Sequence, residues 1–239
     1  MIIKNIKSFT NTALLAVLVM CCFSCSTDLY DTYDEYSEGE IANVGKAEGI
    51  YAVQGNGRLS FVVAINADPK IKKGFITWNV GEDQESFEID RTVFQNENIE
   101  VEVVAEEGLY EFEVYLEDAS GNKSISTYYI ATILGEEYRA SLANRTVVSV
   151  DANSDTEALI TWEENVNNEL LVKTEITYTD SQDLTEKTIV VDASETETIV
   201  PNFQTEGTFS YVSTYKASAE SSDVFVTDAT EGTFSVNID

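Results

Sequence analysis

The chain has 239 residues and is strongly acidic, because 43 Asp and Glu residues outnumber 14 Lys and Arg residues and leave a formal charge of −29. It has no histidine, and its three cysteines all lie within the first 25 residues. An acidic surface repels phosphates, and the composition removes the commonest general base and the commonest metal ligands. We therefore exclude nucleic-acid binding and expect no enzyme, no catalytic residue, no metal and no cofactor.

Residues 1–24 are expected to be a lipoprotein signal peptide. A charged start precedes an apolar run, Ala13 to Phe23, and the small residue Ser24 comes directly before Cys25, as in an export signal. The run is shorter than the roughly 20 apolar residues that a spanning helix needs. Because a cysteine follows the cut, the segment resembles a bacterial lipoprotein signal, with Cys25 as the lipidated residue. Plain secretion stays open, since Cys22 stands where such signals usually have leucine.

Residues 25–45 are expected to form an acidic tether. The signal contains two lysines and no acid, so its removal leaves 12 basic and 43 acidic residues and a formal charge of −31. The tether has few aliphatic residues and no sustained period, so it cannot bury enough apolar surface to fold by itself. An acidic stretch after a lipidated cysteine resembles the signal that sends Bacteroidetes lipoproteins to the outer face of the outer membrane. We expect an outer-membrane protein, held by its lipid and exposed at the cell surface.

Residues 46–133 show the pattern of a first β-sandwich domain. Apolar residues alternate with polar ones at a period of 2, and acids fill the second face of two of the segments. This pattern is typical of antiparallel strands that have one buried face and one solvent-exposed face. Six or seven short strands without a helical period favour an all-β sandwich. The expected strands lie around residues 59–65, 76–80, 88–90, 99–103, 110–116 and 125–133.

The acidic cluster at residues 117–122, EDASGN, admits two interpretations. A divalent cation site needs several oxygens that converge on one point, and the cluster matches no EF-hand pattern. Asp, Ser, Gly and Asn are also the residues that turns prefer, and Gly121 can take a positive φ. We interpret the cluster as a turn between two strands.

A second β-sandwich domain is expected over residues 146–239, where the same kind of alternation returns. The segment TEGTFS occurs at 205–210 and again at 230–235, and each copy is interpreted as a turn followed by a strand. Between the two domains, residues 134–145 form a short linker. Leu134, Tyr138 and Leu142 recur there at four-residue spacing, which favours a helical turn that packs on one or both domains.

Several pieces of the chain resemble a known family. The stretch from 106 to 124 is similar to the penultimate strand of fibronectin type III domains, with Tyr110 at the place of their corner tyrosine. Six further pieces carry a wider resemblance: EYSEGEI (35–41), DPKIKKGFITWNVG (68–81), YEFEVYLEDASGNKS (110–124), GEEYRASLANR (135–145), EITYTD (175–180) and FSYVSTY (209–215). With these pieces the chain resembles, over about residues 34–236, the DUF4998 type of Bacteroidetes lipoprotein. The resemblance implies two fibronectin-like domains on a surface lipoprotein, often associated with glycan-uptake loci.

The first functional hypothesis is a surface binding module for a polysaccharide. Sugar faces would stack on exposed aromatic rings, and carboxylates would accept hydrogen bonds from hydroxyl groups. The alternation offers Tyr115, on the acidic face of its strand, and one of the pair Tyr128 and Tyr129. Trp78 and Trp162 have apolar neighbours at two-residue spacing, so we expect both in the core.

Two other classes remain open. In the second hypothesis the sandwiches are non-catalytic spacers or assembly partners of an outer-membrane protein, which requires no pocket. An exposed apolar patch or an uncharged edge strand would favour it. The third is a glycosidase with two carboxylates, but the sequence marks out no pair with a defined separation.

Overall fold

The computed structural model describes residues 43–154, 156–164 and 169–234. The export signal, the lipidation residue Cys25 and most of the acidic tether therefore lie outside the described residues. The described part consists mainly of antiparallel strands, with one short helix and one short helical turn.

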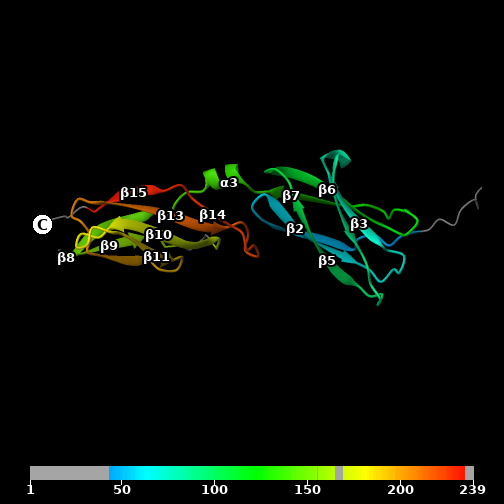
Figure 1. The fold of residues 1–239 in the computed structure, drawn as a ribbon, viewed down its shortest axis with the longest axis horizontal. Coiled ribbons are helices and arrows are strands. Elements are labelled where there is room, and N and C mark those ends of the chain that lie inside the picture. Colours follow the sequence, from blue (N-terminus) through cyan, green and yellow to red (C-terminus); the bar gives the residue numbers. More distant parts are fainter. Residues whose placement is uncertain (1–42, 155, 165–168, 235–239) are drawn as a thin grey trace, which may run out of the picture. The chain divides into compact units, whose positions relative to one another are not determined.

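The first sandwich has seven strands in two sheets (Figure 1). One sheet has the order β1-β2-β5 and the other the order β4-β3-β6-β7, and all pairings are antiparallel. The strands are β1 (Gly49–Gln54), β2 (Arg58–Ile65), β3 (Lys73–Trp78), β4 (Asp83–Glu88), β5 (Glu97–Val104), β6 (Gly108–Glu117) and β7 (Thr127–Ile133).

The second sandwich repeats this order. Its sheets are β12-β9-β8 and β11-β10-β13-β14, and β15 continues the last sheet by pairing with β13. The same strand succession in both sandwiches is that of tandem fibronectin type III-like domains, so the predicted all-β fold class is confirmed. The strands are β8 (Val147–Ser154), β9 (Glu157–Trp162), β10 (Leu171–Thr179), β11 (Glu186–Asp192), β12 (Glu197–Pro201), β13 (Thr208–Lys216), β14 (Val224–Val226) and β15 (Thr230–Thr233).

Aromatic rings fill the core of the first sandwich. Phe112 on β6 is fully buried, and its ring centre lies 4.9 Å from that of Phe61 and 6.0 Å from that of Trp78. The ring of Tyr110 lies 5.8 Å from that of Phe112, and its hydroxyl donates a hydrogen bond to the carbonyl of Glu106 (3.1 Å). This is the bond of a tyrosine corner, so the role expected for Tyr110 is confirmed.

The core of the second sandwich is built around Trp162 on β9. The indole is buried, donates a hydrogen bond to the hydroxyl of Thr198 (2.9 Å) and packs edge-on against Tyr211. Both tryptophans are therefore core residues, as predicted, and each sandwich contains one.

The repeated TEGTFS segment differs from its interpretation. Its two copies pair with each other, because Thr208 faces Thr233 and Phe209 faces Gly232 across β13 and β15. The second copy therefore forms strand β15 itself and is not a turn before a strand. The Phe209 ring covers Gly232 so closely that a Cβ there would come within 2.3 Å of it, which explains why this position takes a glycine.

The strand expected at 88–90 overlaps only the end of β4, which runs from Asp83 to Glu88. Two other expected strand limits are also wrong. Strand β3 ends at Trp78, and Val80, expected on its inner face, is fully exposed in the turn Asn79–Gly81. Strand β7 begins at Thr127, so Ile125 lies before it and is exposed. In both cases an apolar residue just outside the strand continues the alternating pattern, so the pattern predicts a strand that is too long.

The segment between the sandwiches contains helix α3 (Glu136–Ser141). The carboxylate of Glu107, from the first sandwich, accepts hydrogen bonds from the backbone N–H groups of Glu137 (2.6 Å) and Tyr138 (2.7 Å). A carboxylate at this end of a helix satisfies N–H groups that have no partner inside the helix. Glu107 of the first sandwich thus caps the N-terminus of α3.

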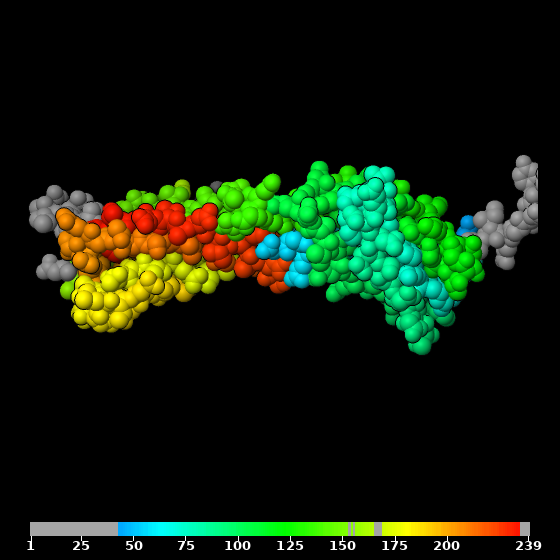
Figure 2. All heavy atoms as spheres, turned by 45° about the horizontal axis from the view of Figure 1, so that its top comes forward, coloured from blue at the N-terminus to red at the C-terminus, as the bar shows by residue number. Residues whose placement is uncertain are grey.

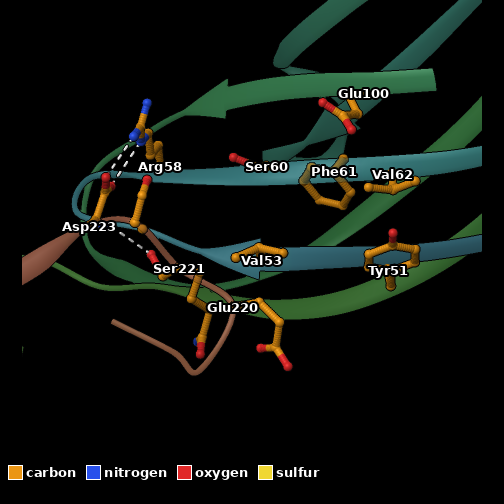
Figure 3. A pocket seen from close by; sticks show the side chains of 13 residues that line it. Tyr51, Val53, Arg58, Ser60, Phe61, Val62, Glu100, Glu220, Ser221 and Asp223 are labelled. Carbon is orange, nitrogen blue, oxygen red and sulfur yellow. Dashed lines mark hydrogen bonds and ion pairs between the residues drawn. The ribbon is translucent and has the colours of Figure 1, made fainter. Parts of the chain in front are cut away.

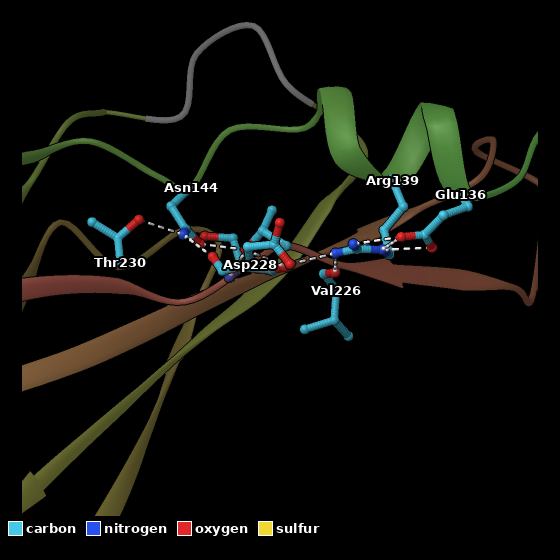
Figure 4. A network of polar contacts seen from close by, with 8 residues as sticks. Glu136, Arg139, Asn144, Val226, Asp228 and Thr230 are labelled. Atoms are coloured by element: carbon cyan, nitrogen blue, oxygen red, sulfur yellow. Dashed lines mark hydrogen bonds and ion pairs between the residues drawn. The ribbon is translucent and has the colours of Figure 1, made fainter.

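The same segment is also bound to the second sandwich. Arg139 forms ion pairs with Glu136 (2.6 Å) and Asp228 (2.8 Å), and the amide of Asn144 donates to the hydroxyl of Thr230 (2.8 Å) (Figure 4). The ring of Tyr138 packs edge-on against Phe225 of β14, within a small buried cluster that includes Leu134 and Ala217. The segment therefore contacts both sandwiches.

Candidate functional site

The three tyrosines predicted as ligand residues have different surroundings. Tyr129 on β7 points toward the core of the first sandwich. Its ring centre lies 5.8 Å from that of Phe61, and its hydroxyl accepts a hydrogen bond from the backbone N–H of Ala52 (3.3 Å). The ring is half-buried, so Tyr128 is the member of the adjacent pair that faces solvent.

Tyr115 on β6 lies on the acidic outer face, as predicted, but other side chains occupy its ring. It is stacked on Phe75 with a centre distance of 5.0 Å and an angle of 16°. The ammonium group of Lys123 lies 4.1 Å from the ring centre, and contact with Tyr115 raises the pKa of this lysine. A cation over an aromatic face is a favourable contact, which a stacking sugar would have to displace.

Tyr128 on β7 presents an exposed ring, with 61% of the residue accessible. Its hydroxyl lies 3.4 Å from a carboxylate oxygen of Glu113, which also accepts a hydrogen bond from the hydroxyl of Ser126 (2.6 Å). Glu113 faces Tyr128 directly across the β6–β7 ladder. The ring is therefore positioned beside a carboxylate and still open to solvent.

A hollow of about 400 Å³ adjoins Tyr128 on the outer face of the sheet β4-β3-β6-β7, and we call it the sheet-face hollow. Thr77 and Glu113, which are neighbours across β3 and β6, both line it. Its lining residues are Thr77, Trp78, Asn79, Val80, Gly81, Leu109, Tyr110, Glu111, Glu113 and Tyr128. The lining combines apolar side chains with carboxylate, amide and hydroxyl groups, so it offers a ligand both contact surface and hydrogen-bond partners.

Two polar groups of the sheet-face hollow lack partners. Thr77 is only 6% exposed, and within the described residues its hydroxyl makes no hydrogen bond. Glu111 is exposed, and no described cation pairs with its carboxylate. Within the described residues only Arg91 Nε, Thr214 Oγ1 and Ser218 Oγ are buried without a hydrogen bond. The Thr77 hydroxyl is not one of them and can be reached from the hollow, so both groups are available to a ligand.

One rim of the sheet-face hollow is a left-handed turn. Asn79, Val80 and Gly81 have φ angles of 51°, 57° and 82°, and the Asn79 amide is held by a hydrogen bond to the carboxylate of Asp83. Asparagine and glycine adopt this region readily, whereas a β-branched residue seldom does. The turn ends β3 and places Val80 at the edge of the hollow.

Apolar side chains continue this face beyond Tyr128. Leu109 on β6 is 73% exposed and Ile130 on β7 is 64% exposed. Glu111 lies between them on the same face, because it pairs directly with Ile130 and is two residues from Leu109. Exposed apolar residues that adjoin one another can mark a contact surface.

A second hollow of about 290 Å³ lies where β1 and β2 meet residues 220–223 of the second sandwich, and we call it the junction hollow (Figure 3). Figure 2 shows the segment around residues 54–58, in light blue, against the orange segment before β14. The guanidinium of Arg58 donates to both oxygens of Asp223 (2.9 and 2.7 Å) and pairs with Glu102. In the junction hollow, the charges of Arg58 and Asp223 are therefore already paired with each other. The sheet-face hollow is for this reason the better candidate for a ligand site.

Asp223 joins the two sandwiches through its carboxylate, and we expect Asp223→Asn to loosen this contact. The hydrogen bonds from Arg58 and from the backbone N–H of Asn56 lower the pKa of Asp223. The contact is therefore complete at neutral pH, and it is lost only as the pH falls through this lowered pKa, below the ordinary carboxyl value of about 3.9. In the variant, NMR relaxation should show the two sandwiches reorienting more independently than in the unmodified chain.

The matched control is Glu102→Gln, which removes the other partner of Arg58 but stays within the first sandwich. It should leave the relaxation of the two sandwiches as it is in the unmodified chain. Equal relaxation in all three proteins would show that the Asp223 contact does not restrict the junction.

The described residues contain no group of three or more acidic side chains that could hold a metal ion. The cluster at 117–122 is a turn, as interpreted, and Gly121 has a φ of 83°. Asp118 accepts hydrogen bonds from the side chain (2.8 Å) and the backbone N–H (2.9 Å) of Asn122, which lower the pKa of its carboxyl group. Its oxygens are directed into the turn itself.

No motif in the sequence marks Thr77, Glu111 or Glu113 as site residues. The alternation places both glutamates on the outer face with Tyr115, so their orientation could have been read from it. The burial of Thr77 has no such signal, because it depends on neighbours from β4 and β6.

Two fibronectin type III-like sandwiches with a solvent-facing hollow define a binding or structural module. Nothing in the described residues points to catalysis, and none of their helices has the length and hydropathy to cross a membrane. The chain belongs to the DUF4998 family, described as a domain of unknown function, which matches residues 25–225.

Two solved structures with tandem fibronectin domains are similar to the chain. The FN1-FN3 domains of chicken CNTN1 show 13% identity and a TM-score of 0.34, over 81% of this chain and 68% of that one. A segment of two fibronectin type III domains from chicken tenascin shows 12% identity and a TM-score of 0.32, over 79% of this chain and 98% of that one. A comparison with curated proteins gave no match.

Proposed function

We propose that the chain is a lipid-anchored surface protein of the outer membrane whose first sandwich binds a glycan, as part of a polysaccharide-uptake system. The observation that carries the proposal is the exposed ring of Tyr128 beside the carboxylates of Glu111 and Glu113 in the sheet-face hollow. A sugar face stacks on the ring, and sugar hydroxyls donate hydrogen bonds to the carboxylates. The hollow of about 400 Å³ lies within the usual size range of ligand sites.

Tyr128→Ala is expected to abolish retention of the full chain in polysaccharide affinity gels. The variant removes the exposed aromatic ring of this hollow. By analogy with base–aromatic stacking, the stacking of a sugar on such a ring contributes about 1–3 kcal/mol, which is a loss of affinity of about 5- to 150-fold. Retention is measured against a gel without polysaccharide.

Tyr51→Ala is the matched control, because Tyr51 is also exposed but lines the junction hollow. It should be retained like the unmodified chain. If Tyr51→Ala loses retention and Tyr128→Ala keeps it, the glycan site is the junction hollow and the present assignment is wrong.

A second candidate function is assembly with an outer-membrane protein. Leu109 and Ile130, exposed beside Tyr128, are the observation that favours it, since a partner could cover this apolar row. The edge strands β4 and β5 carry acids, which disfavours pairing through these two edges. The other two edge strands, β1 and β7, carry no charged residue, which also favours assembly. If no polysaccharide in a broad panel retains the unmodified chain, assembly replaces glycan binding as the proposed function.

The localisation part of the proposal rests on Cys25. Changing Cys25 to Ala is expected to move the protein from the membrane fraction to the soluble fraction, because the lipid can no longer be attached. The substitutions Cys21→Ala and Cys22→Ala, which remove the other two cysteines, should leave it in the membrane fraction. Retention of the Cys25→Ala protein in membranes would refute the anchor.

A further inference from the structure

We propose, as a consequence of the glycan-binding function above, that the sheet-face hollow accepts neutral, hydroxyl-rich sugar units and rejects sugars that carry carboxylates. Three side chains determine this specificity: Glu111, Glu113 and Thr77. The specificity depends on which of them can donate and which can only accept hydrogen bonds, and on the charge that surrounds them.

The charge of the hollow has one sign. Glu111 and Glu113 are its two ionisable carboxylates, and no lysine or arginine is among its lining residues. The lysines on the same sheet face are engaged elsewhere: Lys73 pairs with Glu88 (3.3 Å), and Lys123 lies over Tyr115. An anionic sugar would therefore meet two carboxylates without a counter-charge.

The hydrogen-bonding capacity of the hollow also favours hydroxyl groups. An ionised carboxylate only accepts hydrogen bonds, so Glu111 and Glu113 require donors from the ligand. A sugar hydroxyl can donate, whereas the carboxylate of a uronate only accepts. The matching ligand is thus a polyol rather than an acid.

Thr77 is the independent observation. It lies between the core residues Ile76 and Trp78, so its side chain is on the outer face, and it is 94% buried without a hydrogen bond among the described residues. Its hydroxyl oxygen is not among the atoms that are buried without a partner, so it can be reached from the hollow. A ligand hydroxyl there can both donate to it and accept from it.

The test compares matched polymers on affinity gels with the full chain. Soluble starch, mixed-linkage β-glucan and galactomannan are each used in neutral form and after oxidation of the primary hydroxyls to carboxylates. Salt at about 0.15 M limits the Debye length to about 8 Å, so that repulsion by the whole acidic chain is screened. At least one neutral polymer should retain the chain, and its oxidised form should not.

The variants assign the effect to the three side chains. Thr77→Val should weaken retention by the neutral polymer about fivefold, the equivalent of one lost hydrogen bond, and Thr77→Ser, which keeps the hydroxyl, should restore it. Glu111→Gln with Glu113→Gln should weaken neutral binding and reduce the discrimination against the oxidised polymer. Glu186→Gln, an exposed acid on β11, is the control for net charge and should change neither.

The outcomes separate this inference from the function on which it rests. If a neutral polymer and its oxidised form retain the chain equally, the specificity is wrong although the glycan-binding function stands. The specificity is also wrong if Thr77→Val binds as the unmodified chain does while its circular dichroism is unchanged. If no polymer retains the unmodified chain, the glycan-binding function fails and this inference fails with it.

Discussion

Replacing Phe112 with alanine is expected to lower the free energy of unfolding of the first sandwich by about 3–5 kcal/mol. The side chain is fully buried and lies between the rings of Phe61, Trp78 and Tyr110. Its removal takes away transfer free energy and leaves a cavity that the two packed sheets can close only in part. Chemical denaturation followed by tryptophan fluorescence measures the loss.

Each sandwich contains one tryptophan, so the effect can be located. In a Trp162→Phe background, fluorescence reports on Trp78 and hence on the first sandwich alone. Phe112→Leu, which keeps much of the volume, should cost clearly less than Phe112→Ala. A loss below about 1 kcal/mol for the alanine variant would contradict the central place of Phe112 in this core.

Replacing Arg145 with alanine is expected to cost the second sandwich about 2–3 kcal/mol of unfolding free energy. Arg145 is only 6% exposed, and burial lowers the pKa of its guanidinium. The guanidinium donates to the carbonyls of Glu163 (3.1 Å) and Asp192 (3.4 Å) and lies 5.6 Å from the ring centre of Trp162. Alanine would remove these bonds and uncover the indole.

Arg145→Met is the informative comparison, because methionine keeps an apolar chain over Trp162 without the hydrogen bonds. It should be destabilised less than the alanine variant. Lys187→Met removes an exposed cation from the same sandwich and should change stability little. If Arg145→Ala and Lys187→Met unfold at the same denaturant concentration, Arg145 does not hold this part of the fold together.

Alternation at a period of 2 was enough to predict the two sandwiches. The inward set of β2, formed by Leu59, Phe61, Val63 and Ile65, is almost completely buried, as the pattern requires. What the pattern could not show is where a strand ends. Val80 continues the apolar alternation after Trp78, but the backbone has already turned. The alternation of apolar residues does not predict where such a turn begins.

The candidate site was predictable only in part. The alternation put Tyr115 on the acidic face, but the residues that cover its ring, Phe75 and Lys123, come from other segments. The choice between Tyr128 and Tyr129 depends on strand register, which pairs Tyr128 with Glu113 and which local sequence does not fix. Arg145, assigned to the linker, is buried by residues 18 and 47 positions further along the chain.

Val80 places conformational strain at the rim of the sheet-face hollow. A β-branched residue at a φ of 57° costs about 1–3 kcal/mol of conformational free energy, and full exposure means that no apolar burial offsets this cost. Glycine or asparagine would fit the same backbone with less strain. The stability of the fold therefore does not explain a valine at this position, which lies at the rim of the sheet-face hollow. Residues held in sparsely populated backbone conformations cluster at active and ligand-binding sites, which agrees with the place of Val80 beside this hollow.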